Sequence, residues 1–109
     1  MKKVLFYKTM SGGANKPPKI ETGTGYKQIY AVLGTDREIS LIFEKRAYDW
    51  SITEERSGLL ILCNFSTRKA AAEAVTPELI TRIYERLPSC NKYITMVNIE
   101  RGKREDITA

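Results

Sequence analysis

The chain contains no histidine among its 109 residues and only two cysteines, Cys63 and Cys90. Without histidine there is no His-dependent catalytic triad and no histidine general base, and the commonest metal ligand is missing. The cysteines lie far apart and lack the Cys-x-x-Cys spacing of a zinc site. The sequence therefore predicts no metal and no cofactor. It favours free thiols over a disulfide, as is usual in the cytoplasm.

Long hydrophobic runs are also missing. The run "GLLILC" has the length of a strand, far below the about 20 residues that cross a bilayer. The opening "MKKVLFYKT" has too short an apolar run for a signal peptide and no small-residue cleavage site after it. A hydrophobic content of 42% is enough for a packed interior. We therefore expect one domain over residues 1–109, located in the cytoplasm, with no membrane partner.

The net charge of +5 is concentrated at one end of the chain. Residues 1–27 hold six lysines and one glutamate (6 − 1 = +5), whereas residues 28–109 hold twelve basic and twelve acidic side chains (12 − 12 = 0). Such an asymmetry is typical of a chain that binds an anionic partner, nucleic acid above all. The alternative is a surface that carries lysines for solubility alone.

Alternating hydrophobicity predicts strands at 2–8, 27–34, 38–45, 48–53 and 59–65. Short turns join the last four, which indicates an antiparallel meander. In the fourth strand Tyr48, Trp50 and Ile52 are expected to face the core, with Ser51 and Thr53 outward. The fifth strand is apolar on both faces, which is typical of a central strand covered on both sides.

The hydrophobic period then changes to that of helices. Residues 66–75 begin with Ser66 or Thr67 as N-cap and are rich in alanine, and residues 76–88 begin with Thr76 as N-cap. Residues 92–100 alternate again and predict a closing strand, followed by a tail at 101–109 that is expected to fray. The whole is an α+β domain: an antiparallel sheet of five to six strands with two consecutive helices on one face.

The segment 10–26, "MSGGANKPPKIETGTGY", predicts a flexible connection. It lacks the GxxxxGK[ST] pattern of a phosphate-binding loop, has two prolines where amide donors would be needed, and leads into no helix. Its glycines and its Pro17-Pro18 pair are typical of a mobile basic arm that presents Lys16 and Lys19. A neutral insertion without function is the alternative.

Candidate nucleic-acid contacts lie in the N-terminal strand, in the arm and at the start of the first helix. They are Lys2, Lys3, Lys8, Lys16, Lys19, Lys27, Tyr26, Arg68 and Lys69. Because the N-terminal charges are all lysine, we expect diffuse attraction to phosphates and low sequence specificity. No catalytic residue and no metal ligand is assigned.

The segment 48–74 contains a hairpin that runs into F-x-T-R-K-x-A and a helix. This pattern resembles the arm-type DNA-binding domain at the start of phage integrases. That family places a three-stranded sheet in the major groove and braces it with such a helix, so the resemblance implies DNA contact, with Arg68 and Lys69 placed for phosphate. In contrast to those domains, the strand "GLLILCNF" carries no basic residue.

Three functions are compatible with these features. The first is a non-catalytic nucleic-acid-binding accessory protein of phage or mobile-element type. The second is a protein-protein interaction module, a regulator or inhibitor that forms a homodimer or binds a protein partner through a sheet edge. The third is a small His-independent ribonuclease toxin, because "FYKTMSG" resembles the opening of some phage-encoded toxins. Among the three, enzymatic activity is the least expected.

Overall fold

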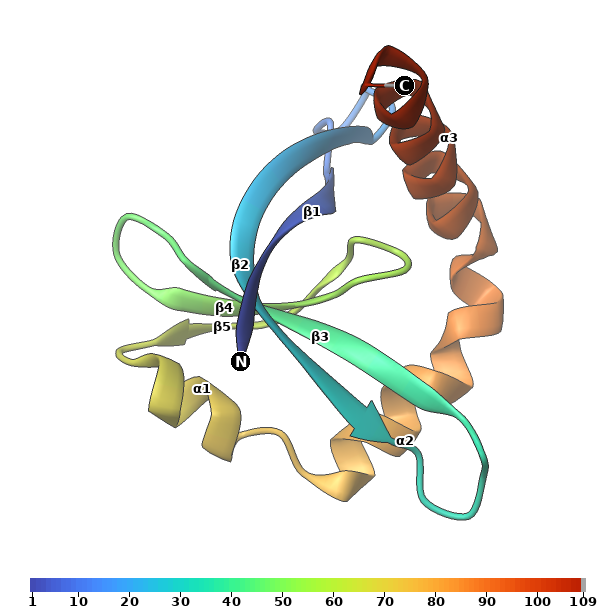
Figure 1. The fold of residues 1–109 in the computed structure, drawn as a ribbon. Helices are drawn as coiled ribbons and strands as arrows, with labels where there is room; N and C mark the ends of the chain where they lie inside the picture. The colour runs from blue at the N-terminus through green and yellow to red at the C-terminus, as the bar shows by residue number, and fades with distance from the viewer. Residues whose placement is uncertain (109) are drawn as a thin grey trace.

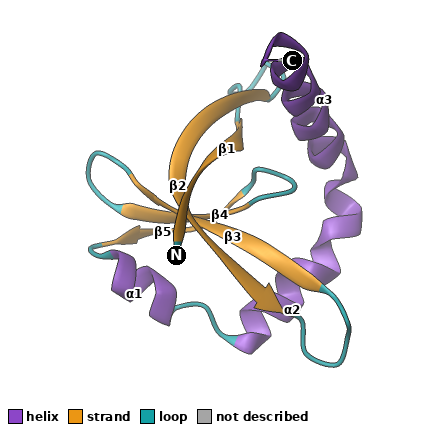
Figure 2. Ribbon diagram, in the orientation of Figure 1, coloured by secondary structure: helices purple, strands orange, loops and turns teal. Residues whose placement is uncertain are grey.

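The structure is a computed structural model that describes the backbone of residues 1–108 and the side chains of residues 1–104. Its five strands follow one another in the order β1-β2-β3-β4-β5 in one antiparallel sheet. The helices follow in an arc around the sheet (Figures 1 and 2). The elements are β1 (Lys2–Met10), β2 (Lys19–Ala31), β3 (Glu38–Lys45), β4 (Trp50–Glu54), β5 (Leu60–Phe65), α1 (Arg68–Glu73), α2 (Pro77–Arg86), the 3-10 turn η1 (Leu87–Cys90) and α3 (Asn91–Thr108).

The predicted α+β class, the antiparallel meander and the two helices that follow it are confirmed. Both helix starts are set by threonine caps. The Thr67 hydroxyl accepts a hydrogen bond from the Ala70 amide at 3.0 Å, and the Thr76 hydroxyl accepts one from Leu79 at 3.1 Å. Each cap satisfies an amide that the first helical turn leaves without a partner.

The expected closing strand at 92–100 is wrong, because these residues lie in α3. Pro88 does not end the helical region: it sits in η1, through which the chain passes from α2 into α3. The contacts of α3 recur at helical spacing, since Ile94 packs on the core, Val97 is fully buried and Arg101 lies over the Tyr7 ring. Burial of this one face outweighs the β-propensity of the sequence. The expected frayed tail is helical through Thr108, and residue 109 lies outside the described residues.

The connection between the first two strands is shorter than expected. β1 pairs with β2 from Lys2 opposite Lys27 to Met10 opposite Lys19, which leaves only 11–18 as a loop. The glycines of "ETGTGY" lie within β2, where they allow side chains and backbone of neighbouring strands to approach closely. A Cβ at Gly25 would lie 2.6 Å from Cγ2 of Ile42 on β3, so any larger residue would push β2 away.

Two side-chain expectations for β4 and β5 are also wrong. Tyr48 belongs to the turn before β4 and is fully exposed, whereas Ile52 is buried and Trp50 half-buried. β5 is an edge strand, because the meander places the last strand at the border of the sheet. Its Leu60 and Leu62 are 49% and 37% exposed. Apolar residues on both faces therefore do not mark a central strand here.

The main core lies between the sheet and the helices α1 and α2. Its buried members are Val32, Ile39, Leu41, Phe43, Ile52, Ala71, Ile80, Ile83 and Leu87. The side chains of Phe6, Ile42, Ser51 and Thr53 are buried outside this cluster. No helix in the described part of the chain is long and apolar enough to cross a membrane.

The sheet curls so that the end of β1 contacts the turn between β4 and β5. The Thr9 amide donates to the Gly58 carbonyl at 2.8 Å, and the Thr9 hydroxyl donates to the Ser57 carbonyl at 2.7 Å. The buried Glu54 carboxylate holds this turn, since it accepts the amides of Arg56 and Ser57 at 2.7 and 2.8 Å. A carboxylate with two backbone donors is well solvated by the protein itself.

Gly58→Ala tests the contact between the end of β1 and the β4–β5 turn. Gly58 has φ +69°, and a Cβ there would lie 2.8 Å from the Thr9 nitrogen and the Tyr7 oxygen. Left-handed backbone and overpacking together are expected to lower the free energy of unfolding by about 2–4 kcal/mol, measured by urea denaturation. The matched control is Gly34→Ala, where φ is +77° but no atom lies within 4 Å. That substitution should cost only about 1–2 kcal/mol. Equal losses would contradict a role for the contact.

Candidate functional site

Arg68, Tyr26 and Trp50 stack where the start of α1 meets the sheet. The Cζ atom of Arg68 lies 4.4 Å from the centroid of the Tyr26 ring, and that ring lies 6.2 Å from the Trp50 ring at an angle of 38°. The Thr67 cap fixes the first turn of α1 and thereby the position from which Arg68 extends. The contact is a cation–π interaction, which favours a guanidinium lying over an aromatic face.

Basic side chains flank this stack. Lys3 on β1 is directly opposite Tyr26 on β2, so the two side chains share a face of the sheet. Lys69 follows Arg68 in α1, and Lys3, Arg68 and Lys69 are all exposed. None of the three takes part in an ion pair with another described side chain. We call this group of Lys3, Tyr26, Arg68 and Lys69 the Tyr26 patch.

The structure does not bring the other five predicted residues into this patch. Lys2 is exposed and lies opposite Lys27, so it is on the other face of the sheet from Lys3 and Tyr26. Lys27 pairs with Glu55 at 3.0 Å, Lys19 pairs with Glu21 at 3.2 Å, and Lys8 pairs with Glu44 at 2.9 Å. Lys16 is exposed in the loop 11–18. The N-terminal charge is therefore divided, and three of its six lysines are locally balanced by carboxylates.

Lys8 and Lys16 line a cavity of about 510 Å³ instead. It lies among the end of β1, the loop 11–18, strands β3 and β4, the turn before β5 and the start of α3. Its walls combine charged side chains and hydroxyls with an apolar part. They include Lys8, Lys16, Glu44, Arg46, Ser51, Thr53, Met10, Leu59, Leu60 and Tyr93. We refer to it as the β1–β4 cavity.

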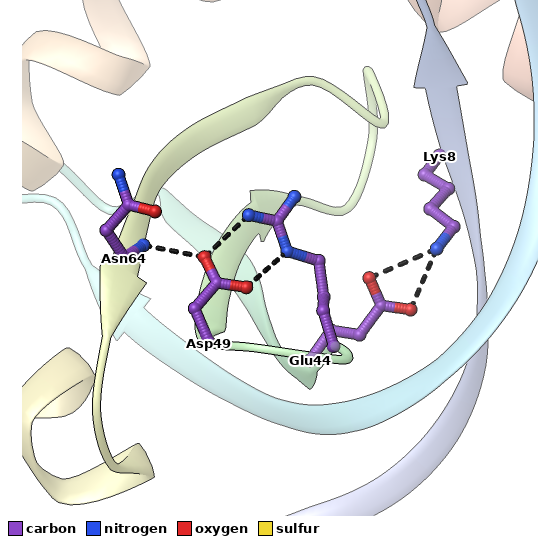
Figure 3. Close-up of polar contacts among 5 residues, drawn as sticks. Lys8, Glu44, Asp49 and Asn64 are labelled. Carbon is purple, nitrogen blue, oxygen red and sulfur yellow. Dashed lines mark hydrogen bonds and ion pairs between the residues drawn. The ribbon is translucent and has the colours of Figure 1, made fainter.

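Two ion pairs stiffen the surroundings of the β1–β4 cavity (Figure 3). The Lys8 ammonium donates to both oxygens of Glu44, at 3.1 and 2.9 Å, and the Glu44 residue is only 8% exposed. Arg46 donates through Nε and Nη2 to the two oxygens of Asp49 at 2.7 and 2.6 Å. The backbone N–H of Asn64 donates a third hydrogen bond to Asp49 at 2.7 Å. Bidentate pairs of this kind are stronger and more directional than single contacts.

These hydrogen bonds shift the pKa values of both Arg46 and Asp49. The Arg46 donors, and then the Asn64 amide, lower the pKa of the Asp49 carboxyl below its ordinary value. The hydrogen bonds to Asp49 raise the pKa of Arg46, so the pair stays charged at neutral pH. Asn64 is held at φ +69°, a left-handed conformation that asparagine tolerates better than most residues.

The sequence did not point to the polar wall of the β1–β4 cavity. Ser51 and Thr53 were expected to face outward, yet their residues are only 1% and 3% exposed. The expectation is wrong because the curled sheet buries both faces of β4. The one available signal was Glu44, a carboxylate at the end of the otherwise apolar run "ISLIF".

Comparison with protein-family models, with curated proteins and with solved structures found no match. Among the side chains that the structure describes, no group of three His, Cys, Asp or Glu residues is placed to hold a metal ion. Cys63 and Cys90 are free thiols. The Tyr26 patch and the β1–β4 cavity are the two candidate sites of the described residues.

Asp49→Asn tests the second ion pair through its pH dependence. Asp49 has an ordinary pKa of about 3.9 in the unfolded chain and a lower pKa when folded, so its charge stabilises the fold above about pH 5. This contribution is lost as the pH falls through the folded pKa. The stability difference between wild type and Asp49→Asn, measured by urea denaturation, should be largest near neutral pH and shrink in acid.

The control for this test is Asp36→Asn, because the Asp36 side chain is 95% exposed and pairs loosely with Arg37 at 3.6 Å. It should change stability little at any pH. A difference for Asp49→Asn that stays constant or grows in acid would contradict the ion-pair interpretation.

Proposed function

We propose that the protein binds single-stranded nucleic acid through the Tyr26 patch, with low sequence specificity and without catalysing a reaction. The observation that carries this proposal is the Arg68 guanidinium lying 4.4 Å above the Tyr26 ring, with Lys3 opposite Tyr26 on the neighbouring strand. An aromatic and cationic stack flanked by lysines is the combination that single-strand-binding surfaces use.

The stack offers a surface for a nucleobase. Tyr26 is half-buried and one face of its ring is covered by Arg68, whereas Arg68 itself is exposed. An unstacked base lies on the outer side of the guanidinium plane, which supports such contacts as well as an aromatic ring does. The Trp50 ring lies 6.2 Å from the Tyr26 ring, and both rings pack against the core. Only a base outside a duplex offers its face in this way, which favours a single strand.

Phosphates are attracted by the flanking cations. Lys3 is exposed and lies across the strand pair from Tyr26, and Lys69 is exposed and follows Arg68 in α1. Lysine acts as a point charge and reads no base edge, and the Arg68 fork is engaged by an aromatic face. Binding is therefore expected to depend strongly on salt and weakly on sequence.

The resemblance to the arm-type domain of phage integrases implies DNA contacts by Arg68 and Lys69, and both residues belong to the Tyr26 patch. In the structure they begin α1 directly after the β4–β5 hairpin, as in the pattern that carries the resemblance. An accessory role in a phage or mobile element is a prediction from that resemblance alone.

Lys3→Glu combined with Arg68→Glu tests the Tyr26 patch. Labelled single- and double-stranded DNA and RNA are titrated and followed by fluorescence anisotropy at about 50 and about 200 mM salt. The wild type should bind single strands best and lose affinity steeply at the higher salt. The double variant should bind at least about tenfold more weakly and show a salt slope reduced by about two.

A charge-matched control is Arg82→Glu combined with Lys92→Glu, which changes one arginine and one lysine that are exposed on α2 and α3. It should reduce binding by much less than the Lys3 and Arg68 pair. Absence of binding at low salt, or equal losses in the two double variants, would contradict the proposal.

A second candidate function is binding of a protein through β5. This strand is an edge of the sheet, and its Leu60 and Leu62 are half-exposed. An edge strand with apolar side chains is a template for an added strand from a partner or from a second copy of the chain. The third possibility, a ribonuclease, stays a prediction of the sequence.

Leu62→Lys separates the second candidate from the first. If β5 mediates self-association, light scattering should show the wild type as a dimer and the Leu62→Lys variant as a monomer, with nucleic-acid binding unchanged. A wild type that stays monomeric up to about 100 μM would argue against a dimer formed through this edge.

A further inference from the structure

We propose that the β1–β4 cavity binds a phosphate monoester of nucleotide size, namely a nucleoside monophosphate, either free or as the terminal nucleotide of a strand. This inference does not depend on the Tyr26 patch, because the two sites share no residue.

Ser51 and Thr53 provide two hydroxyls without hydrogen-bond partners among the described residues. They are alternate residues of β4 and therefore point to the same side of the strand, about 7 Å apart along it. Neither hydroxyl forms a hydrogen bond with another described residue. No fully buried side-chain oxygen or nitrogen among the described residues lacks a partner. The two hydroxyls therefore keep a small exposed surface, and both residues line the cavity.

The charges of the wall favour an anion. Lys8, Lys16 and Arg46 contribute three positive charges and Glu44 one negative charge, a sum of +2 that falls to +1 when Asp49 behind Arg46 is included. The Lys8 side chain is 24% exposed, and its ammonium has three N–H groups to share between Glu44 and a ligand. A phosphate monoester carries a charge of about −1.5 to −2 at pH 7 and three acceptor oxygens, which suit two lysines and two hydroxyls.

The size and the apolar part of the cavity exclude a bare phosphate as its best ligand. A volume of about 510 Å³ lies in the range of sites for small organic ligands. Met10, Leu59, Leu60 and Tyr93 line the remainder of the wall. A planar base with its ribose buries against such side chains, and the Tyr93 ring offers a stacking surface.

Calorimetric titration of the full chain tests this site with four probes: adenosine monophosphate, cytidine monophosphate, adenosine and inorganic phosphate. Both monophosphates should bind saturably, and adenosine and inorganic phosphate should bind at least about tenfold more weakly. Thr53→Val removes one hydroxyl at nearly constant shape, and Lys16→Ala removes one charge from an exposed loop position. Each should weaken monophosphate binding about three- to tenfold, with circular dichroism confirming the fold.

The control is Lys19→Ala, because Lys19 is exposed, pairs with Glu21 and lies outside the cavity lining. It should leave monophosphate affinity unchanged. The Lys3→Glu, Arg68→Glu variant should also leave it unchanged, which separates this site from the Tyr26 patch. Oligonucleotides with and without a terminal phosphate then distinguish a strand end from a free nucleotide: a preference for the phosphorylated end identifies the strand end as a ligand, and equal binding assigns the cavity to free nucleotides.

The proposal is overturned if no monophosphate binds saturably at about 5 mM, or if adenosine binds as tightly as its monophosphate. It is also overturned if Thr53→Val and Lys16→Ala both bind like the wild type. Because nucleic-acid binding by the Tyr26 patch is measured separately, either of the two proposals can be contradicted while the other stands.

Discussion

The contact between Thr9 and the β4–β5 turn determines the shape of this sheet. It brings the end of the first strand against a turn that the buried Glu54 carboxylate holds in place. An open meander would expose one face, whereas this curl buries Ser51 and Thr53 on a strand whose Ile52 is already in the core. The β1–β4 cavity exists because these buried faces are not completely filled by side chains.

The helix starts and the meander of the last four strands could be predicted from the sequence, because they depend on local chemistry and short turns. Thr67 and Thr76 cap their helices through hydroxyls that bond amides three residues away. The helical conformation of residues 92–100 could not be predicted from local chemistry. Its β-branched residues suit a strand, and only the packing of Val97 and Ile94 against distant parts of the chain makes the helix the better solution.

The same difference between local chemistry and long-range packing applies to the candidate sites. Arg68 and Tyr26 were identified by residue type, but their stacking depends on how α1 docks on the sheet, which a sequence does not show. The cavity was missed because Ser51 and Thr53 alternate with Ile52 as outward-facing residues would. Polar residues on such a strand indicate solvent only when the sheet has a solvent-facing side. Because this sheet is curved, β4 has no solvent-facing side.

The contact at Thr9 also bears on the order of folding events. The meander is built from hairpins between neighbouring strands, whereas the contact at Thr9 joins residues 9 and 58, far apart in the chain. Closing a long loop costs more entropy than closing a hairpin, so strands β3 to β5 are expected to associate before β1 locks onto their turn. The folding transition state would then contain β3 to β5 but not the β1 contact. Substitutions of Thr9 should accelerate unfolding and leave the folding rate nearly unchanged, and a slower folding rate would show that closure comes early.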